Sequence, residues 1–362
     1  MVVVSLKNSP IADFDAGSTP GFDGDKSLGE KTLVERGRAL DDLQDMLYAN
    51  GRSGDHRSVL LVLQGMDTAG KGGIARHVIG LVDPQGVELT AFKAPTEEEK
   101  EHDFLWRIRK ALPEPGMIGV FDRSHYEDVL IVRVHDLVPR AQWSRRYGQI
   151  NTFEESVADK GTTIIKVMLH ISKDEQKSRL TERLERPDKH WKFNPGDIDE
   201  REHWADYQEA YQVALTRCST QGAPWFVVPA DRKWYARLAV QQLVLEHLRA
   251  LDLQWPEADF DVEANTERLR EQIAAREQAE SGTAPPVEAT MDAANTLVRA
   301  VLTAPVPVIA AVNGPAAGVG VSLALSADLM VMSDDAYLLA PRPDKAYLVH
   351  VDALINSWFA VD

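Results

Sequence analysis

The chain has 362 residues, 44% of them hydrophobic and 27% charged, which is typical of a globular protein long enough for two domains. Its formal net charge of −16 argues against non-specific nucleic-acid binding, so a polyanionic ligand must meet a local basic patch. The single cysteine, Cys218, excludes an internal disulfide framework and fits a reducing cytoplasm, where we expect the protein to reside. No signal peptide is recognisable, and prolines and glycines interrupt the small apolar run at residues 305–325, so we expect no membrane partner.

The amino-terminal part predicts an arm followed by a helix. Residues 1–28 are rich in Gly, Asp, Ser and Pro and show no period, which predicts a flexible arm. Residues 31–49 place leucines near one helical face, so we expect this helix to pack on the sheet.

A strand, a glycine-rich loop and a helix follow one another within residues 58–82. The β-branched apolar run at 59–63 predicts a buried strand, and apolar residues after the glycines recur at helical spacing. Four residues separate Gly65 from Gly70 and Lys71, which is the spacing of a phosphate-binding P-loop. We therefore predict phosphate binding by Gly65, Gly70, Gly72 and Lys71, the alternative being a glycine turn that only joins a strand to a helix.

The position after Lys71 is Gly72, where a P-loop usually has a Ser or Thr that holds Mg²⁺. A metal ligand must then come from elsewhere, and Asp67 inside the loop is the first candidate. Asp122 directly follows another predicted strand, 117–121. Because carboxyl ends of parallel strands form one crevice, we expect Asp67 and Asp122 to face one Mg²⁺ (or Mn²⁺). A helix cap or a turn is the alternative role for Asp122.

Further strands are predicted at residues 87–92, 163–171 and 225–228, and helical stretches alternate with them. This order predicts an α/β fold, a P-loop kinase-like three-layer sandwich with a mainly parallel sheet covered on both faces.

The segment 166–192 holds eight Lys or Arg against five acidic residues in a chain that is acidic overall. Arg179, Arg183 and Arg186 are spaced by four and three residues, which predicts one helix face carrying three guanidinium groups. A solvated, salt-bridged face is the alternative. The segment lies where a P-loop kinase has its lid, so we expect a helical lid that stabilises phosphate charge.

Several motifs occur in a fixed order over residues 29–255: GMDTAGKGG, DRSHYEDVLIVRVHDLVP, LHISKDEQKSRLTERL, KHWKF and APWFVVPADRKWYARL. Residues 29–256 thereby resemble the second family of polyphosphate kinases, the polyphosphate:nucleotide phosphotransferases, and most of all the subgroup acting on both AMP and ADP. The resemblance implies Mg²⁺-dependent transfer of the terminal phosphate of inorganic polyphosphate to AMP or ADP, reversible in principle, by a homodimer or homotetramer. We expect direct in-line attack without a phosphoenzyme, and a structural or substrate-contacting role for His125.

The resemblance also implies roles for single residues. Asp67 and Asp122 match carboxylates that position Mg²⁺ and the accepting phosphate. The matching phosphate-binding cations are Lys71 and Arg123, with Arg133 in the same motif, and the lid cations that line the polyphosphate channel are Arg179, Arg183, Lys189 and Lys192. One residue departs from the pattern, because the subgroup usually has an acid where this chain has Gly72.

The composition changes after residue 256. Residues 257–281 hold eight acids and three arginines, so residues 257–289 are interpreted as an acidic helix and a linker. Within residues 290–362, the stretch 295–340 resembles the crotonase (enoyl-CoA hydratase/isomerase) family. The resemblance places an oxyanion-hole turn near Gly318 and Gly320 and puts Ser322 where hydratases carry a catalytic acid. The upstream half of that family has no counterpart, so we expect a partial, non-catalytic fold or an interaction segment.

Three other functions compete with polyphosphate-dependent transfer. A P-loop kinase could use ATP on a small molecule, although the cations of 166–192 favour a long polyanion. An inactive scaffold conflicts with the presence of Asp67, Lys71, Asp122 and Arg123. Acyl-CoA chemistry by the carboxy-terminal segment lacks most of the required site.

Overall fold

The chain forms two units in the computed structural model, an amino-terminal unit, Met1–Glu257, and a carboxy-terminal unit, Ala258–Asp362. The structure describes residues 10–282, 287–312, 316–317, 319–332, 338–341 and 346–349.

Five parallel strands form the centre of the amino-terminal unit, in the order β2-β3-β1-β4-β5. They are β1 Ser58–Gly65, β2 Val87–Ala91, β3 Ile118–Asp122, β4 Thr162–His170 and β5 Trp225–Pro229. All residues of β1 are buried because this central strand has neighbours on both sides and helices on both faces. The predicted α/β class with a parallel sheet is confirmed.

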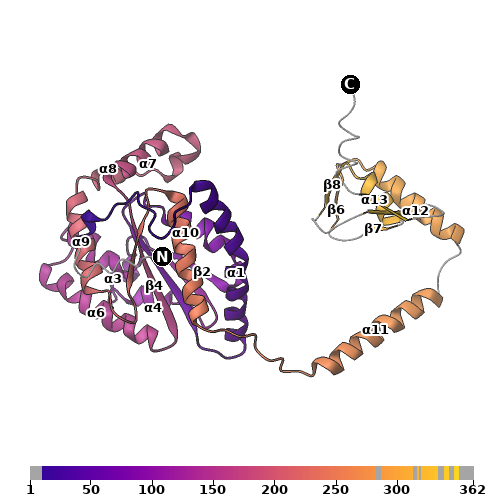
Figure 1. Ribbon diagram of the computed structural model, residues 1–362, viewed down its shortest axis with the longest axis horizontal. Coiled ribbons are helices and arrows are strands. Elements are labelled where there is room, and N and C mark those ends of the chain that lie inside the picture. Colours follow the sequence, from indigo (N-terminus) through magenta and orange to yellow (C-terminus); the bar gives the residue numbers. More distant parts are fainter. Residues whose placement is uncertain are drawn as a thin grey trace. The chain divides into compact units, whose positions relative to one another are not determined.

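Helices cover both faces of this sheet (Figure 1). On one face α1 Lys26–Arg52 packs against α10 Lys233–Ala250, and α10 also contacts α2 Lys71–His77. On the other face α6 Arg140–Ala158 contacts β4. The remaining α-helices are α3 Glu97–Lys100, α4 Trp106–Lys110, α5 Ile131–Val134, α7 Lys173–Glu185, α8 Gly196–Asp199 and α9 Trp204–Arg217. Short 3-10 helices are η1 Ile11–Asp13, η2 Ile79–Leu81, η3 Pro84–Gly86, η4 His125–Val129 and η5 Pro187–Lys192.

The segment before α1 packs on the unit from Pro10 onward, in contrast to the flexible arm expected from its composition. Ile11 is buried, and its backbone N–H donates to Gln212 Oε1 at 2.6 Å. The Tyr235 hydroxyl donates to Pro20 O at 2.7 Å. Helix α1 begins earlier than expected because Asp25 caps it, accepting from Leu28 N. Residues 1–9 lie outside the described residues.

The strand order and the parallel direction bring the sequence motifs together. Since every strand runs the same way, β1 ends at Gly65 beside Leu169 of β4, and Asp122 at the end of β3 pairs with Leu63 of β1. The predicted P-loop and the predicted strand-end carboxylate therefore lie at one edge of the sheet, where α/β proteins bind ligands.

The carboxy-terminal unit contains α11 Val262–Gly282, α12 Val287–Leu302 and α13 Val319–Ser326. Strand β6 Ile309–Val312 pairs in parallel with β8 Leu329–Met332, and a second sheet joins β7 Ala316–Ala317, β9 Leu338–Pro341 and β10 Ala346–Val349. Among its described residues only Val321 and Ala324 are buried apolar side chains. Of the expected crotonase-like turn, Gly320 and Ser322 fall within α13, and Gly318 lies outside the described residues.

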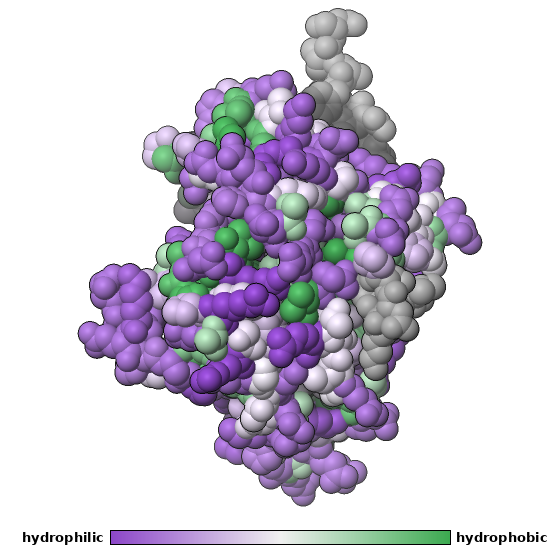
Figure 2. Space-filling view, turned by 90° about the vertical axis from the view of Figure 1, so that its left-hand side faces the viewer, coloured by the Kyte–Doolittle hydropathy of each residue, from purple (hydrophilic) through white to green (hydrophobic). Residues whose placement is uncertain are grey.

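The surface is mainly polar on the face shown in Figure 2, with hydrophobic residues in small separate patches. None of the helices in the described residues combines the length and the apolar character needed to cross a membrane.

Candidate active site

The glycine-rich loop closes tightly between β1 and α2. Gly65 has φ +152°, and a Cβ there would lie 2.7 Å from Leu169 O on the neighbouring strand. Gly70, the N-cap of α2, has φ +113°. Both positions require glycine, which has no Cβ and tolerates positive φ. Lys71 crosses the loop and donates from Nζ to Gly65 O at 2.9 Å. At Gly72, by contrast, an added Cβ would meet no atom within 4 Å.

Arg179 of α7 holds the loop from outside. Its Nη1 donates to Thr68 O at 2.9 Å and to Ala69 O at 3.0 Å. Its remaining N–H groups donate to Glu175 Oε1, Ala230 O and Asp231 O. The guanidinium is buried and all five donors have protein acceptors. This geometry ties the P-loop to α7 and to the end of β5.

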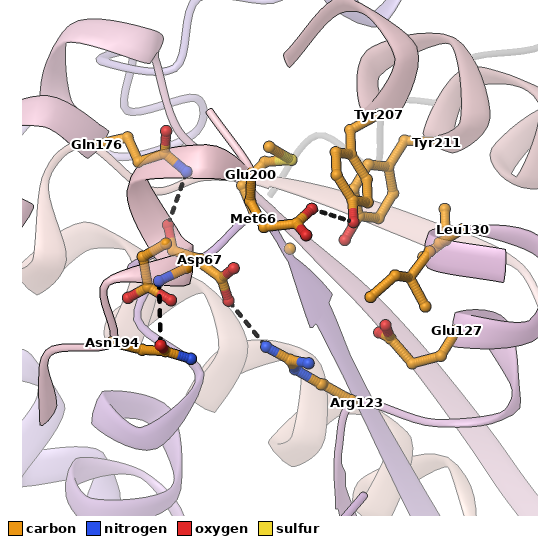
Figure 3. Close-up of a pocket in the computed structure, with 14 residues that line it drawn as sticks. Met66, Asp67, Arg123, Glu127, Leu130, Gln176, Asn194, Glu200, Tyr207 and Tyr211 are labelled. Atoms are coloured by element: carbon orange, nitrogen blue, oxygen red, sulfur yellow. Dashed lines mark hydrogen bonds and ion pairs between the residues drawn. The ribbon is translucent and has the colours of Figure 1, made fainter. Parts of the chain in front are cut away.

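Asp122 and Arg123 form a turn at the end of β3, opposite the P-loop. Arg123 has φ +65°, and its backbone N–H donates to Leu63 O at 3.0 Å. Its Nη2 forms an ion pair with Asp67 Oδ1 at 2.8 Å, which joins the turn to the P-loop (Figure 3). Burial alone lowers the pKa of Arg123, but the carboxylates of Glu127, Asp67 and Asp122 raise it above the ordinary arginine value, so its charge is fixed.

A cavity of about 950 Å³ lies over the P-loop. Its wall carries ten Lys or Arg side chains against four acidic ones, in a chain whose net charge is −16. The predicted residues that line it are Asp67, Gly70, Lys71, Gly72, Asp122, Arg123, Arg179, Arg183, Lys189 and Lys192. The local basic patch that a polyanion requires is present at this edge of the sheet.

Four cations of this cavity were missed by sequence reasoning, namely Arg76, Lys93, Lys233 and Arg237. Lys233 and Arg237 are four residues apart at the start of α10, directly after β5. That spacing, placed after a buried strand, is the signal that could have identified them.

The three guanidinium groups expected on one helix face separate in the structure, which corrects that expectation. Arg179 turns toward the loop, whereas Arg183 contacts Lys192 O and Asp197 at the cavity wall. Arg186 follows the last residue of α7, is half exposed and pairs with Asp188. In the same segment Lys189 pairs with Glu182, and Lys192 lies 4.8 Å from the centre of the Trp191 ring.

Arg133 lies apart from the other predicted residues and lines neither this cavity nor the smaller pocket beside it. It pairs with Glu209, contacts the Tyr147 hydroxyl at 3.3 Å and lies over the Trp143 ring. Its contacts join α5, α6 and α9 behind the site.

The smaller pocket, about 200 Å³, adjoins the cavity through Asp67 and Arg123 (Figure 3). Its wall is acidic, because Arg123 is the one Lys or Arg that lines it, against the carboxylates of Asp67, Glu127, Asp197 and Glu200. Tyr207 and Tyr211 add two aromatic rings to this wall. The Tyr207 hydroxyl donates to Glu200 Oε2 at 2.6 Å. Burial raises the pKa of Glu127, although Arg123 and Lys71 oppose the shift. Sequence reasoning missed this pocket; the four-residue spacing of the two tyrosines on α9 was its only signal.

The carboxylates suit a divalent cation only in part. Within the described part of the chain, no three His, Cys, Asp or Glu side chains form a metal-binding group. Mg²⁺ commonly takes one or two carboxylates and completes its octahedron with substrate phosphates and water. Asp67 and Asp122 both line the cavity beside Lys71, so their oxygens fit Mg²⁺ or Mn²⁺ that is shared with a bound phosphate.

A parallel α/β sheet with a P-loop and a strand-end carboxylate at its carboxyl edge defines a P-loop kinase-like protein. The chain belongs to the polyphosphate kinase 2 family, whose model matches residues 24–256. The enoyl-CoA hydratase/isomerase family model matches residues 275–344.

Two relatives and one solved structure illustrate the family likeness. The AMP/ADP-polyphosphate phosphotransferase of Meiothermus ruber is 46% identical over 246 residues, which are 68% of this chain and 91% of the relative. The ADP-polyphosphate phosphotransferase of Rhodopseudomonas palustris is 43% identical over 255 residues, 67% of this chain and 86% of the relative. The crystal structure of polyphosphate kinase 2 from Arthrobacter aurescens TC1 is 57% identical with a TM-score of 0.71, covering 72% of this chain and 92% of that one.

Proposed function

We propose that this protein transfers the terminal phosphate of inorganic polyphosphate to AMP and ADP in the presence of Mg²⁺. The observation that carries the proposal is the cavity over the P-loop, whose wall carries ten cationic side chains that can compensate the charge of phosphates. Family membership and the names of the two relatives point to the same activity.

The cavity and the smaller pocket beside it suggest separate binding sites for the phosphate donor, polyphosphate, and for the acceptor nucleotide. The cationic cavity suits a long polyanion because fixed positive charges compensate each phosphate in turn. The smaller pocket suits a nucleoside, since Tyr207 and Tyr211 offer aromatic surface and Glu127 and Glu200 can accept hydrogen bonds from hydroxyl or amino groups. Asp67 and Arg123 belong to both walls, so the reacting phosphates meet beside them.

The reaction we propose is a direct in-line displacement. A terminal phosphate oxygen of the nucleotide forms a bond to the terminal phosphorus of polyphosphate, and the bond from that phosphorus to the shortened polyphosphate breaks. Lys71 and Arg123 stabilise the charge on the transferred group, and Arg179 keeps the loop in place without contacting it. Asp67 and Asp122 would hold Mg²⁺, which when bound would supply further charge neutralisation at the phosphates. His125 is 1% exposed and pairs with Glu154, which argues against a phosphohistidine.

The first test measures ATP and ADP formation from long-chain polyphosphate with AMP or ADP and Mg²⁺. Replacing Asp67 or Asp122 by Asn should lower the rate about 100-fold or more, because each removes a charge that orders the phosphates. Asp159→Asn is the matched control, since this carboxylate is exposed beyond the end of α6. A folded wild-type protein that makes neither product would refute the proposal. Sedimentation of the same preparation tests the dimer or tetramer that the family resemblance implies.

A further inference from the structure

A buried polar network lies behind the strand-end turn, away from the cavity and the smaller pocket. Lys166, in the middle of β4, is 0% exposed. Its Nζ donates to Glu154 Oε2 at 2.5 Å, to the Tyr126 hydroxyl at 3.0 Å and to Cys218 O at 2.6 Å. Glu154 Oε1 also contacts the Tyr126 hydroxyl at 2.8 Å and His125 Nε2 at 3.1 Å. The network thus joins β4, α6, η4 and the end of α9.

A buried ion pair such as Lys166–Glu154 contributes little net stability to a protein core. Desolvation of two charges commonly offsets their attraction, and apolar side chains of similar volume often serve as well. Glu154 is 1% exposed, and although burial raises the pKa of this carboxylate, Lys166 and His125 keep it below its ordinary value. Stability therefore gives no sufficient reason for the pair, and its contacts with η4 suggest another role.

The short helix η4 joins the network to the active site. Tyr126 and His125 face Glu154 and Lys166. Glu127 of the same helix lines the smaller pocket, and Arg123 lies two residues before the helix (Figure 3). Arg123 is held at φ +65°, a conformation that costs energy for a residue with a side chain. Such a conformation persists only where the surrounding structure fixes it.

The sheet fixes the first residues of this turn from the other side. Ser124 is buried and caps η4 by accepting from Tyr126 N at 3.2 Å. With its nitrogen toward Glu127 Oε1 at 3.1 Å, the Gln64 amide accepts from Ser124 N and Oγ. Gln64 thus contacts Ser124 and Glu127. His125 and Tyr126, which lie between these two residues in the chain, are held by Glu154 and Lys166.

We infer that the Lys166–Glu154 pair is a positioning device, which holds Tyr126 and His125 so that Arg123 and Glu127 face Asp67 and the reacting phosphates. The inference rests on the proposed function. Neither Lys166 nor Glu154 touches a substrate in this arrangement, so both act through η4. Losing the pair should therefore lower the rate of transfer more than the binding of either substrate.

The test is a double variant, Glu154→Leu with Lys166→Met, in which two apolar side chains of similar volume replace the pair. Replacing both partners avoids leaving one buried charge uncompensated. We expect the double variant to unfold within a few degrees of wild type, to lose kcat by about tenfold or more and to keep KM for ADP and polyphosphate within about twofold.

The matched control is Asp55→Leu with Arg57→Met, a pair just before β1 at the opposite edge of the sheet. It should leave kcat unchanged. Wild-type kcat in the folded Glu154/Lys166 double variant would overturn the inference. If that variant does not fold, Tyr126→Phe decides, because it removes only the hydroxyl between the two charges: a lowered kcat supports the inference, and an unchanged kcat refutes it. An inactive wild type would refute the proposed function itself, and the network's role with it.

Discussion

Arg179 shows how a conspicuous cation in a phosphate site can act on the backbone. Its five N–H donors reach two carbonyls of the P-loop, two carbonyls after β5 and Glu175. Lysine has three donors and no planar fork, so it cannot reproduce these contacts. We expect Arg179→Lys to lower kcat/KM at least about tenfold while the protein stays folded.

Steady-state kinetics with both substrates measures this effect. Arg186→Lys is the control from the same segment, because Arg186 is half exposed and pairs with Asp188 outside the cavity. If Arg179→Lys has the kcat/KM of wild type, the P-loop does not depend on the five donors of the Arg179 guanidinium.

Asp128, the neighbour of Glu127, makes the stability of the folded protein depend on pH. Burial raises the pKa of Asp128 to about 6, although Arg146, whose Nη1 lies 2.8 Å from Oδ1, opposes the shift. The folded protein therefore holds this proton more tightly than the unfolded chain, in which the carboxyl has its ordinary pKa of 3.8. The proton's contribution to stability is complete below pH 3.8 and is lost as the pH rises through 6.

Comparison with Asp128→Asn isolates this contribution. Between pH 4 and 7, the free energy of unfolding of wild type should fall relative to that of the variant by about 2 kcal/mol, which is most of the free energy equivalent to the pKa shift. Denaturant titrations at each pH measure the difference. Parallel curves for the two proteins would contradict the raised pKa.

Helix α2 contains a glycine whose absence of a side chain serves no steric purpose. Gly72 has open space where a Cβ would lie and no left-handed φ, whereas Gly70 has φ +113°. We expect Gly72→Ala to stabilise the protein by about 0.5–1 kcal/mol, since alanine favours helix, and to keep the activity. Gly70→Ala should destabilise the protein and lower the activity, because the φ of Gly70 is unfavourable for alanine. Thermal unfolding and the transfer assay report both, and a destabilised Gly72→Ala would show that this turn needs glycine.

The sequence predicts most of this element order because each signal is local. The spacing of Gly65, Gly70 and Lys71 and the acid after a buried apolar run are sufficient to place Asp67 and Asp122 at one sheet edge. The contacts of Arg179 could not be predicted in this way, since they depend on where α7 crosses the loop. The same holds for the pocket of Tyr207 and Tyr211, which exists only because α9 packs over the end of β1 and η4.

At the scale of the whole molecule, the chain concentrates positive charge in one place. The −16 net charge keeps other surfaces acidic, so a polyanion is attracted chiefly to the cavity with its ten cations. The carboxy-terminal unit buries little apolar surface within its described residues, and the kinase family model ends at residue 256.

We therefore expect a chain ending at residue 257 to keep the transfer activity within about twofold and the main unfolding transition within about 2 °C. Calorimetry and the transfer assay on both chains measure this. A chain ending at residue 240 is the control, because it removes the buried Leu243, Val244 and Leu248 of α10 and should not fold. A large gain of activity after truncation would instead make the carboxy-terminal unit an inhibitor.

Cys218, whose carbonyl oxygen accepts a hydrogen bond from Lys166, allows the opening of the buried network to be measured by labelling its thiol. The thiol is 0% exposed, and burial raises its pKa to about 12, so a thiol reagent meets almost no thiolate in the folded protein. Labelling must wait until the end of α9 separates from β4. Because the chain has one cysteine, the labelling rate of the unmodified protein measures how often this region opens, and bound substrates that hold η4 in place should slow it.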